Sequence, residues 1–227
     1  MEKDRLLKRF FQLYRRFSFY ENQVSFIEGR NYYLIFAFYD VLVNIKTKYN
    51  ISAGEIARDL TDLEKGINIF IAECQNKYPF VVSYNENAEF NEKVIIEKFN
   101  SEVSDYFDEF VIAYNHLMNY KNGLLLEELL IEINNFLSHF VNFVTKDYFS
   151  SGKSHLCRGA LDGYKEIIYN ENKVLIAHAD LIKDLVAIRI NELQNIGNMT
   201  NENSCIDVIG SYKNIGITIL QLINSLK

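Results

Sequence analysis

The sequence predicts an all-α protein, a multi-helix bundle of about seven to nine helices. Three observations predict this fold class. The chain has 227 residues and a single proline, Pro79, which is the residue type that most strongly interrupts a helix. Apolar residues make up 48% of the chain, enough for a sizeable core. They recur at spacings of three and four, which is the period of one helix face.

The apolar period divides the chain into helices in the following order. We expect the first helix over residues 3–20, and a long, buried central helix over the very apolar residues 31–49. Ser52 and Glu55 have capping-box spacing, so the next helix should begin at about residue 53. The period then predicts helices over residues 53–77, 101–121, 124–149, 155–169, 171–196 and 205–226, with another near 87–99.

Clusters of Asn, Gly, Ser and Pro separate these helices. They lie at Asn50, around Pro79, at Lys121 to Gly123, at Ser150 to Gly152, at Asn170 and at Gly197 to Ser204. We expect one domain spanning residues 1–227, with a candidate subdomain boundary near residues 78–90.

The sequence also predicts the cellular location of the protein. The helix expected at 31–49 has too many polar interruptions to serve as a span of about 20 apolar residues, so we expect no membrane span. The chain opens without a basic and then apolar leader, and its three cysteines cannot form a closed disulfide framework. We therefore expect a cytoplasmic protein.

Charge is unevenly distributed along the chain. Residues 1–20 carry a net charge of +4, whereas the whole chain carries −6. The first helix should place basic side chains opposite its apolar face, where they form a solvated surface, pair with the acidic rest of the chain, or bind a negatively charged partner. A protein partner is the leading expectation, and a nucleic acid is the alternative. The candidate binding residues are Arg5, Arg9, Arg15 and Arg16.

A reactive cysteine is one candidate for chemistry. If Ser154 caps a helix that begins after the Ser150 to Gly152 break, Cys157 lies in the first turn of that helix beside Arg158. The free amides of a first turn and a nearby cation favour a thiolate. The alternative interpretation is a small buried side chain.

Two acidic and imidazole series form a candidate metal site. Each series lies on one helix face with the same spacing, and the two helices should be antiparallel neighbours. Seven residues of helix span about 10 Å, however, so the Glu and His of one helix cannot reach one ion. The alternative is two solvated faces. The series are Asp105, Glu109 and His116, and then Glu128, Glu132 and His139.

A third carboxylate pattern overlaps the first series. Glu86, Glu89, Glu102 and Asp105 are spaced in a way that resembles the acidic pattern of all-helical nucleotide pyrophosphohydrolases. The resemblance covers only these 20 residues. It implies a site in which the four carboxylates hold Mg²⁺ or Mn²⁺ against a nucleotide phosphate. The alternative is an ordinary charged surface.

The helix expected at 171–196 contains two polar residues at the centre of its apolar stripe. His178 and Arg189 lie among Leu175, Ile182, Val186 and Leu193. A buried arginine without a partner costs several kcal/mol, so an acid should approach it. We expect Asp40 to be that acid, in a structural ion pair or a functional polar pocket.

The chain lacks the nucleophile, redox, zinc and dinucleotide motifs, and no histidine has an arginine four to six residues before it. By elimination we expect a protein that works by binding a macromolecular partner, without a cofactor. It would be an accessory subunit, adaptor, inhibitor or immunity-type protein. The alternatives are a nucleic-acid-binding protein that uses the basic first helix, and a phosphohydrolase that depends on Mg²⁺ or Mn²⁺.

Overall fold

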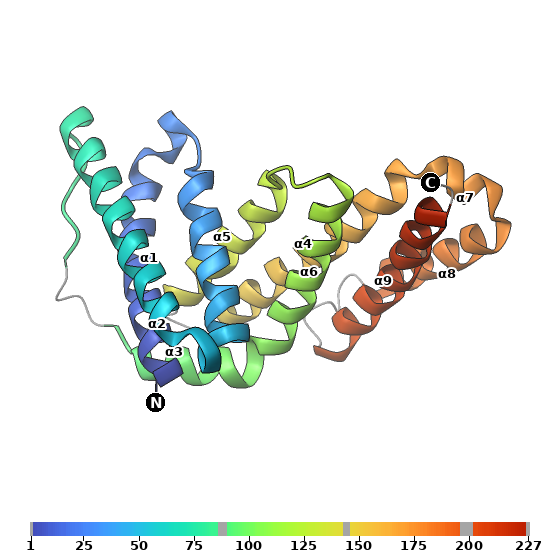
Figure 1. Ribbon diagram of the computed structural model, residues 1–227, viewed down its shortest axis with the longest axis horizontal. Coiled ribbons are helices and arrows are strands. Elements are labelled where there is room, and N and C mark those ends of the chain that lie inside the picture. The colour runs from blue at the N-terminus through green and yellow to red at the C-terminus, as the bar shows by residue number, and fades with distance from the viewer. Residues whose placement is uncertain (1, 86–89, 143–145, 196–201, 226–227) are drawn as a thin grey trace. The chain divides into compact units, whose positions relative to one another are not determined.

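The protein is all-α, as the sequence predicts (Figure 1). The computed structural model describes residues 2–85, 90–142, 146–195 and 202–225, and for residues 146–149, 195 and 202–204 it describes only the backbone. Within these ranges, no helix combines the length and the apolar character needed to cross a membrane. The chain divides into two compact units: unit 1 comprises residues 1–102 and 137–148, and unit 2 comprises residues 103–136 and 149–227.

Unit 1 is built on α1 (Glu2–Glu28), α2 (Tyr32–Lys77), α3 (Glu92–Lys98) and most of a π-helical turn (Phe99–Val103). The 46 residues of α2 form two helices that meet at a kink at Ser52, where the backbone leaves helical geometry. This kink confirms the break expected near Asn50. The candidate boundary near residues 78–90 lies within unit 1.

The helices α1 and α2 pack against each other as a hairpin (Figure 1). Gly29 ends α1 with a positive φ of 79°, a conformation that a side chain would strain. Asn31 caps α2, since its side-chain oxygen accepts a hydrogen bond from the Leu34 amide at 3.1 Å. The apolar face expected of the first helix is buried here, with Phe10 and Phe17 each packed against the Phe38 ring of α2.

Unit 2 contains α4 (Ser104–Tyr120), most of α5 (Glu127–Val141) and α6 (Lys146–Asn170), and then α7 (Asn172–Ala177), α8 (Ala179–Asn195) and α9 (Glu202–Ser225). The break expected at residues 121–123 is confirmed: α4 ends there, with Asn122 and Gly123 at positive φ.

The helices α4, α5 and α6 come close together at Gly159. A Cβ built there would lie 2.4 Å from Cε2 of the buried Phe110 ring and 3.2 Å from Cβ of Glu132. Phe110 belongs to α4 and Glu132 to α5, so the missing side chain lets three helices meet at one point.

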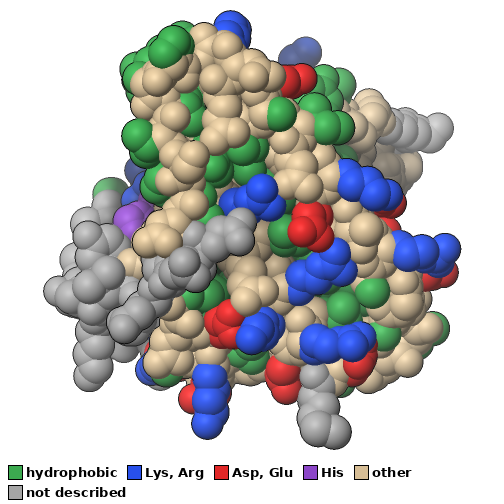
Figure 2. Space-filling view, turned by 90° about the vertical axis from the view of Figure 1, so that its left-hand side faces the viewer, with side chains coloured by type: hydrophobic (Ala, Val, Ile, Leu, Met, Phe, Trp, Pro, Cys, Tyr) green, Lys and Arg blue, Asp and Glu red, His purple; other side chains and the backbone are tan. Residues whose placement is uncertain are grey.

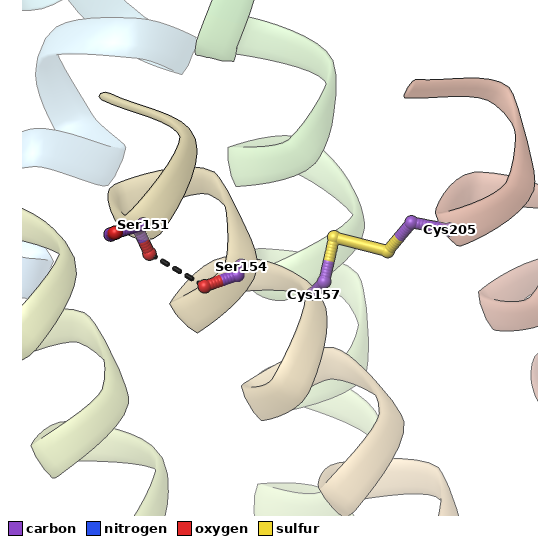
Figure 3. Close-up of a disulfide and its surroundings, with 4 residues drawn as sticks. All are labelled: Ser151, Ser154, Cys157 and Cys205. Carbon is purple, nitrogen blue, oxygen red and sulfur yellow. Dashed lines mark hydrogen bonds between the residues drawn. A yellow bond between two sulfur atoms is a disulfide. The ribbon is translucent and has the colours of Figure 1, made fainter. Parts of the chain in front are cut away.

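The break expected at Ser150 to Gly152 is wrong, because α6 continues through it. The Ser154 hydroxyl donates a 2.7 Å hydrogen bond to the Ser151 carbonyl inside this helix (Figure 3) and does not cap a new one. A helix interior tolerates serines that bond to their own backbone, and it tolerates one glycine at a cost of about 1 kcal/mol. Burial of Leu156, Ala160 and Tyr164 on one face of α6 outweighs that cost.

The prediction that Cys157 is a reactive thiol is also wrong. Cys157 lies in the middle of α6 and forms a disulfide with Cys205 of α9 (Figure 3). Both cysteines are buried, and the bond closes a sequence separation of 48 residues that includes α7 and α8. The sequence did not reveal this pair because three cysteines do not indicate which two come together in the fold.

Candidate functional site

The basic side chains of α1 line an open hollow of about 670 Å³ in unit 1. Figure 2 looks onto this side of the molecule and shows Lys and Arg side chains gathered there with Asp and Glu among them. We call this feature the α1 hollow. Its lining residues are Arg5, Lys8, Arg9, Gln12, Leu13, Arg15, Arg16, Glu64, Tyr84, Phe90 and Glu92.

Amphipathic packing places the arginines in this hollow. The apolar face of α1 is buried against α2, so the basic stripe on its other side remains accessible. The hollow is closed on one side by the second half of α2, which contributes Glu64, and on the other by residues near the start of α3. All four arginines proposed from the sequence therefore line the α1 hollow.

Two contacts hold the segment after α2 against α1 and so position Tyr84. The Val82 amide donates a 2.9 Å hydrogen bond to Oε1 of Gln23. The Tyr84 amide donates a 3.0 Å hydrogen bond to the hydroxyl of Tyr20, which lies on α1. These bonds bring an aromatic ring to a basic surface although more than 60 residues separate the two in sequence.

Acidic residues partly neutralise the cations of the α1 hollow. The Arg9 guanidinium lies 2.8 Å from Oε2 of Glu64 and donates a 3.1 Å hydrogen bond to Oγ1 of Thr61. Lys8 Nζ lies 2.6 Å from Oε2 of Glu92, whose other carboxylate oxygen accepts a hydrogen bond from Gln12. These pairs are partly exposed, so each contributes little to stability and can exchange for an external carboxylate.

Arg15 is held differently. Its guanidinium lies 4.8 Å from the centre of the Phe90 ring and 6.0 Å from the centre of the Tyr84 ring. Such cation–π contacts hold a guanidinium against aromatic rings. Arg16, half-buried in the same lining, makes no ion pair with the described residues.

A second hollow of about 450 Å³ adjoins the first and shares Arg5, Lys8 and Glu92 with it. It extends along α1 toward α3, where Ile96 supplies an apolar surface. The Lys8–Glu92 pair lies between the two hollows. The first hollow is lined by basic and aromatic side chains, whereas the second is lined by acidic, basic and apolar ones.

No protein-family model matches the chain, and comparison with curated proteins and with solved structures finds no significant match.

The two acidic and imidazole series are engaged in separate contacts. Glu109 pairs with Lys213 at 3.0 Å, and Glu132 pairs with His155 at 2.5 Å. His116 Nδ1 lies 3.1 Å from the Tyr164 hydroxyl, and burial lowers the pKa of its imidazole, followed by the effect of Lys213. Asp105 and Glu128 are exposed, and His139 is half-buried. Among the described residues, no three His, Cys, Asp or Glu side chains are placed to hold a metal ion.

The carboxylate pattern that resembles the nucleotide pyrophosphohydrolases is only partly described. Glu86 and Glu89 lie outside the described residues. Glu102 pairs with Lys98 one helical turn before it, and Asp105 is exposed. The described half of the pattern thus belongs to a charged surface.

The buried polar pocket expected around Arg189 is wrong. His178 and Arg189 are exposed, and Arg189 pairs with Glu192 at 2.5 Å. Asp40 is exposed in unit 1, where it accepts a 3.3 Å hydrogen bond from Asn44. The helix α8 carries apolar residues on two faces, and the face turned away from the expected stripe is the less exposed one, with half-buried Leu181, Leu185 and Ile188.

The face of α8 that is buried instead carries an acid. Glu192 is 5% exposed and accepts hydrogen bonds from Lys165 of α6 at 2.5 Å and from the Tyr212 hydroxyl of α9 at 2.6 Å. Burial raises the pKa of its carboxyl, but the hydrogen bonds from Lys165, Tyr212 and Arg189 outweigh burial and bring it below the ordinary value.

Sequence reasoning missed the residues that close the α1 hollow from outside α1, namely Glu64, Tyr84, Phe90 and Glu92. They come from three separate segments, and no local spacing links them to the basic stripe. Nor did the sequence indicate the network of hydrogen bonds that Glu192 accepts from Lys165, Arg189 and Tyr212, which we call the Glu192 network. The one local signal was the single acid among the apolar residues near the end of α8, which sequence alone does not distinguish from a surface glutamate.

Proposed function

We propose that the protein acts by binding, and that the α1 hollow holds an acidic segment of a protein partner. The observation that carries this proposal is that five cationic side chains from α1 and two aromatic rings line the same α1 hollow. Arginine forks bind carboxylates through paired hydrogen bonds, and aromatic residues and arginine are the types most enriched at protein interfaces.

A carboxylate ligand fits this hollow better than a phosphate backbone does. Glu64 and Glu92 already occupy Arg9 and Lys8 in the way that carboxylates of a partner would. A nucleic acid would instead meet these two acids and a chain of net charge −6, which repels it at long range. The nucleic-acid function remains the second candidate, because the same arginines are suited to phosphate.

The test uses two labelled probes of equal charge, an acidic peptide containing Glu, Tyr and Phe and a single-stranded DNA oligonucleotide, with binding measured by fluorescence anisotropy. We expect the full chain to bind the peptide more tightly. Replacing Arg15 and Arg16 by Ala should weaken this binding about tenfold or more, since charged contacts at an interface are worth about 2 kcal/mol or more.

The matched control is Arg58→Ala, which removes an exposed arginine of α2 outside the α1 hollow. It should leave peptide affinity unchanged. Tighter binding of the oligonucleotide, with an affinity that falls steeply as salt rises, would favour the nucleic-acid function. Absence of binding to either probe, or equal loss in the control, would contradict both.

We also propose a cytoplasmic location, and the disulfide provides its test. Disulfides persist mainly in oxidising compartments, so the Cys157–Cys205 bond counts against this location. Thiol alkylation in intact cells, after denaturation in the presence of the alkylating reagent, measures the state of both cysteines. Free thiols would support the cytoplasm, and blocked thiols would contradict it.

A further inference from the structure

The helix α8 exposes a row of apolar side chains in unit 2. Ile182 is 39% exposed, Val186 52%, Ile190 51% and Leu193 52%. Spacings of four, four and three place them on one side of the helix, over about 17 Å of its length. We call this row the α8 stripe. Contiguous exposed apolar surface of this kind marks an interaction site more often than scattered single residues do.

The buried contacts of α8 fix the direction of this stripe. Glu192 is held by Lys165 and Tyr212 on the opposite side of the helix, and α8 packs against α9. Turning the stripe inward would expose this network and separate a buried carboxylate from its partners, at a cost of several kcal/mol. The exposure of the stripe is therefore a property of the folded unit.

Cations border the α8 stripe on both sides. At 100° per residue, Lys183 and Arg189 lie about 60° to either side of Val186, whereas Asp180 and Asp184 lie more than about 100° away. The Lys183 side chain is 78% exposed and that of Arg189 is 45% exposed. Each cation has a carboxylate partner on α8 itself, Asp180 at 3.4 Å from Lys183 and Glu192 at 2.5 Å from Arg189. In both pairs the acid lies about 120° from Val186, on the side of the cation away from the stripe, so the cation is the charged group nearest to each edge of the stripe.

We infer that the α8 stripe is the docking site for an amphipathic helix of a protein partner, one with an apolar face bordered by Glu or Asp. Two parallel or antiparallel helices bury such stripes against each other, and edge charges of opposite sign set the pairing. This inference concerns unit 2 and does not depend on the α1 hollow.

The edge charges decide against a second copy of this chain. A two-fold axis along the helices would bring Lys183 of one copy to the edge that carries Arg189 of the other. A two-fold axis across the helices would bring each edge onto the same edge of the other copy. Both arrangements set cations against cations. An anionic membrane surface is disfavoured by the net charge of −6.

The test uses two fluorescent helical peptides of about 20 residues, long enough to form a helix. Both have leucines at heptad positions a and d. One has Glu at positions e and g, and the other has Lys there. We expect the full chain to bind the Glu-edged peptide at least about tenfold more tightly than the Lys-edged peptide, and Lys183→Glu to reduce this preference.

Val186→Asp should weaken binding of the Glu-edged peptide about tenfold or more, because it places a charge in the centre of the interface. Leu124→Asp is the matched control, since Leu124 is 65% exposed in unit 2 and outside the stripe. It should change nothing, and circular dichroism melting should show both variants folded.

Several outcomes would overturn the inference. The Glu-edged peptide could fail to bind, the two peptides could bind equally, or the two Asp variants could behave alike. Sedimentation velocity that shows a dimer lost on Val186→Asp would identify a second copy as the occupant. Retention of the chain on anionic phosphatidylserine vesicles, lost in the same variant, would identify a membrane.

Discussion

The helix α1 of unit 1 and the helix α8 of unit 2 each carry one buried glutamate, and their carboxylates are in different electrostatic states. In α1, burial raises the pKa of Glu21, and the Arg30 guanidinium at 2.5 Å opposes this only in part. In α8, hydrogen bonds to Glu192 from three side chains outweigh burial. Burial thus raises the pKa of a carboxyl, and several donors that converge on it can reverse that shift.

The outward faces of the two helices also differ. The outward face of α1 is basic and lines a hollow, whereas that of α8 is apolar with basic edges. Each helix therefore uses one face to hold its unit together and leaves another accessible. The Glu192 network links α6, α8 and α9, so we expect it to contribute more to stability than the Glu21 pair.

Replacing each of these two glutamates by Gln should change the free energy of unfolding by different amounts. Glu192→Gln should lower the free energy of unfolding by about 3–5 kcal/mol, because it leaves Lys165, whose side chain is only 17% exposed, without the carboxylate that pairs with it. Glu21→Gln should cost about 2 kcal/mol or less, because the Arg30 side chain is 33% exposed and can be solvated. Urea unfolding of both variants measures this difference. Equal losses in the free energy of unfolding would show that the two glutamates contribute equally to stability.

The disulfide should make unit 2 sensitive to reductant. In the loop-entropy model, reduction of Cys157–Cys205 costs about 2–4 kcal/mol, and the bond encloses α8. Hydrogen exchange should show amide protection lost in α8 and α9 but kept in α1. A Cys157→Ala, Cys205→Ala double variant is the control, since reductant should not change its exchange further. Equal loss of protection in α1 would contradict a local role.

Two glycine substitutions should act in opposite directions. Gly159→Ala forces a Cβ against the buried Phe110 ring and should cost about 1–3 kcal/mol. Gly54→Ala, in the second half of α2, meets no atom within 4 Å and should stabilise by about 0.5–1 kcal/mol. Thermal melting of the two variants tests this pair, and a neutral Gly159→Ala would show that the three helices are less tightly packed there.

The smallest expected effects concern pH. The pKa of Glu192 is lowered in the folded chain, so its contribution to stability is present above the unfolded value of about 4.5 and is lost as pH falls below it. The pKa of Glu21 is raised, so its protonation adds stability as pH falls from the raised folded value toward the unfolded value of about 4.5.

Unfolding free energies measured from neutral to acidic pH should show both contributions. Glu192→Gln should flatten the acid-side loss of stability, and Glu21→Gln should remove the gain at milder acidity. If both variants kept the pH profile of the wild-type chain, neither carboxyl would titrate differently on folding.

The helical class and the orientation of α1 follow from the amino-acid sequence alone, because apolar spacing is local information. With Phe10 and Phe17 on one side and Arg9 and Arg16 on the other, only one face can be buried. The kink at Ser52 and the turn at Gly123 were predictable for the same reason, since capping and positive φ depend on neighbouring residues.

The remaining features of the fold depend on contacts between segments that are distant in sequence. The helix α8 is apolar on two faces, so its spacing fits either orientation, and the partners of Glu192 on α6 and α9 select which face is buried. Distant contacts likewise decide three other features. These are the helix that continues through Ser150 to Gly152, the Cys157–Cys205 pair and the aromatic residues of the α1 hollow. Each depends on groups distant in sequence, whose burial free energy outweighs the local preference of the residues themselves.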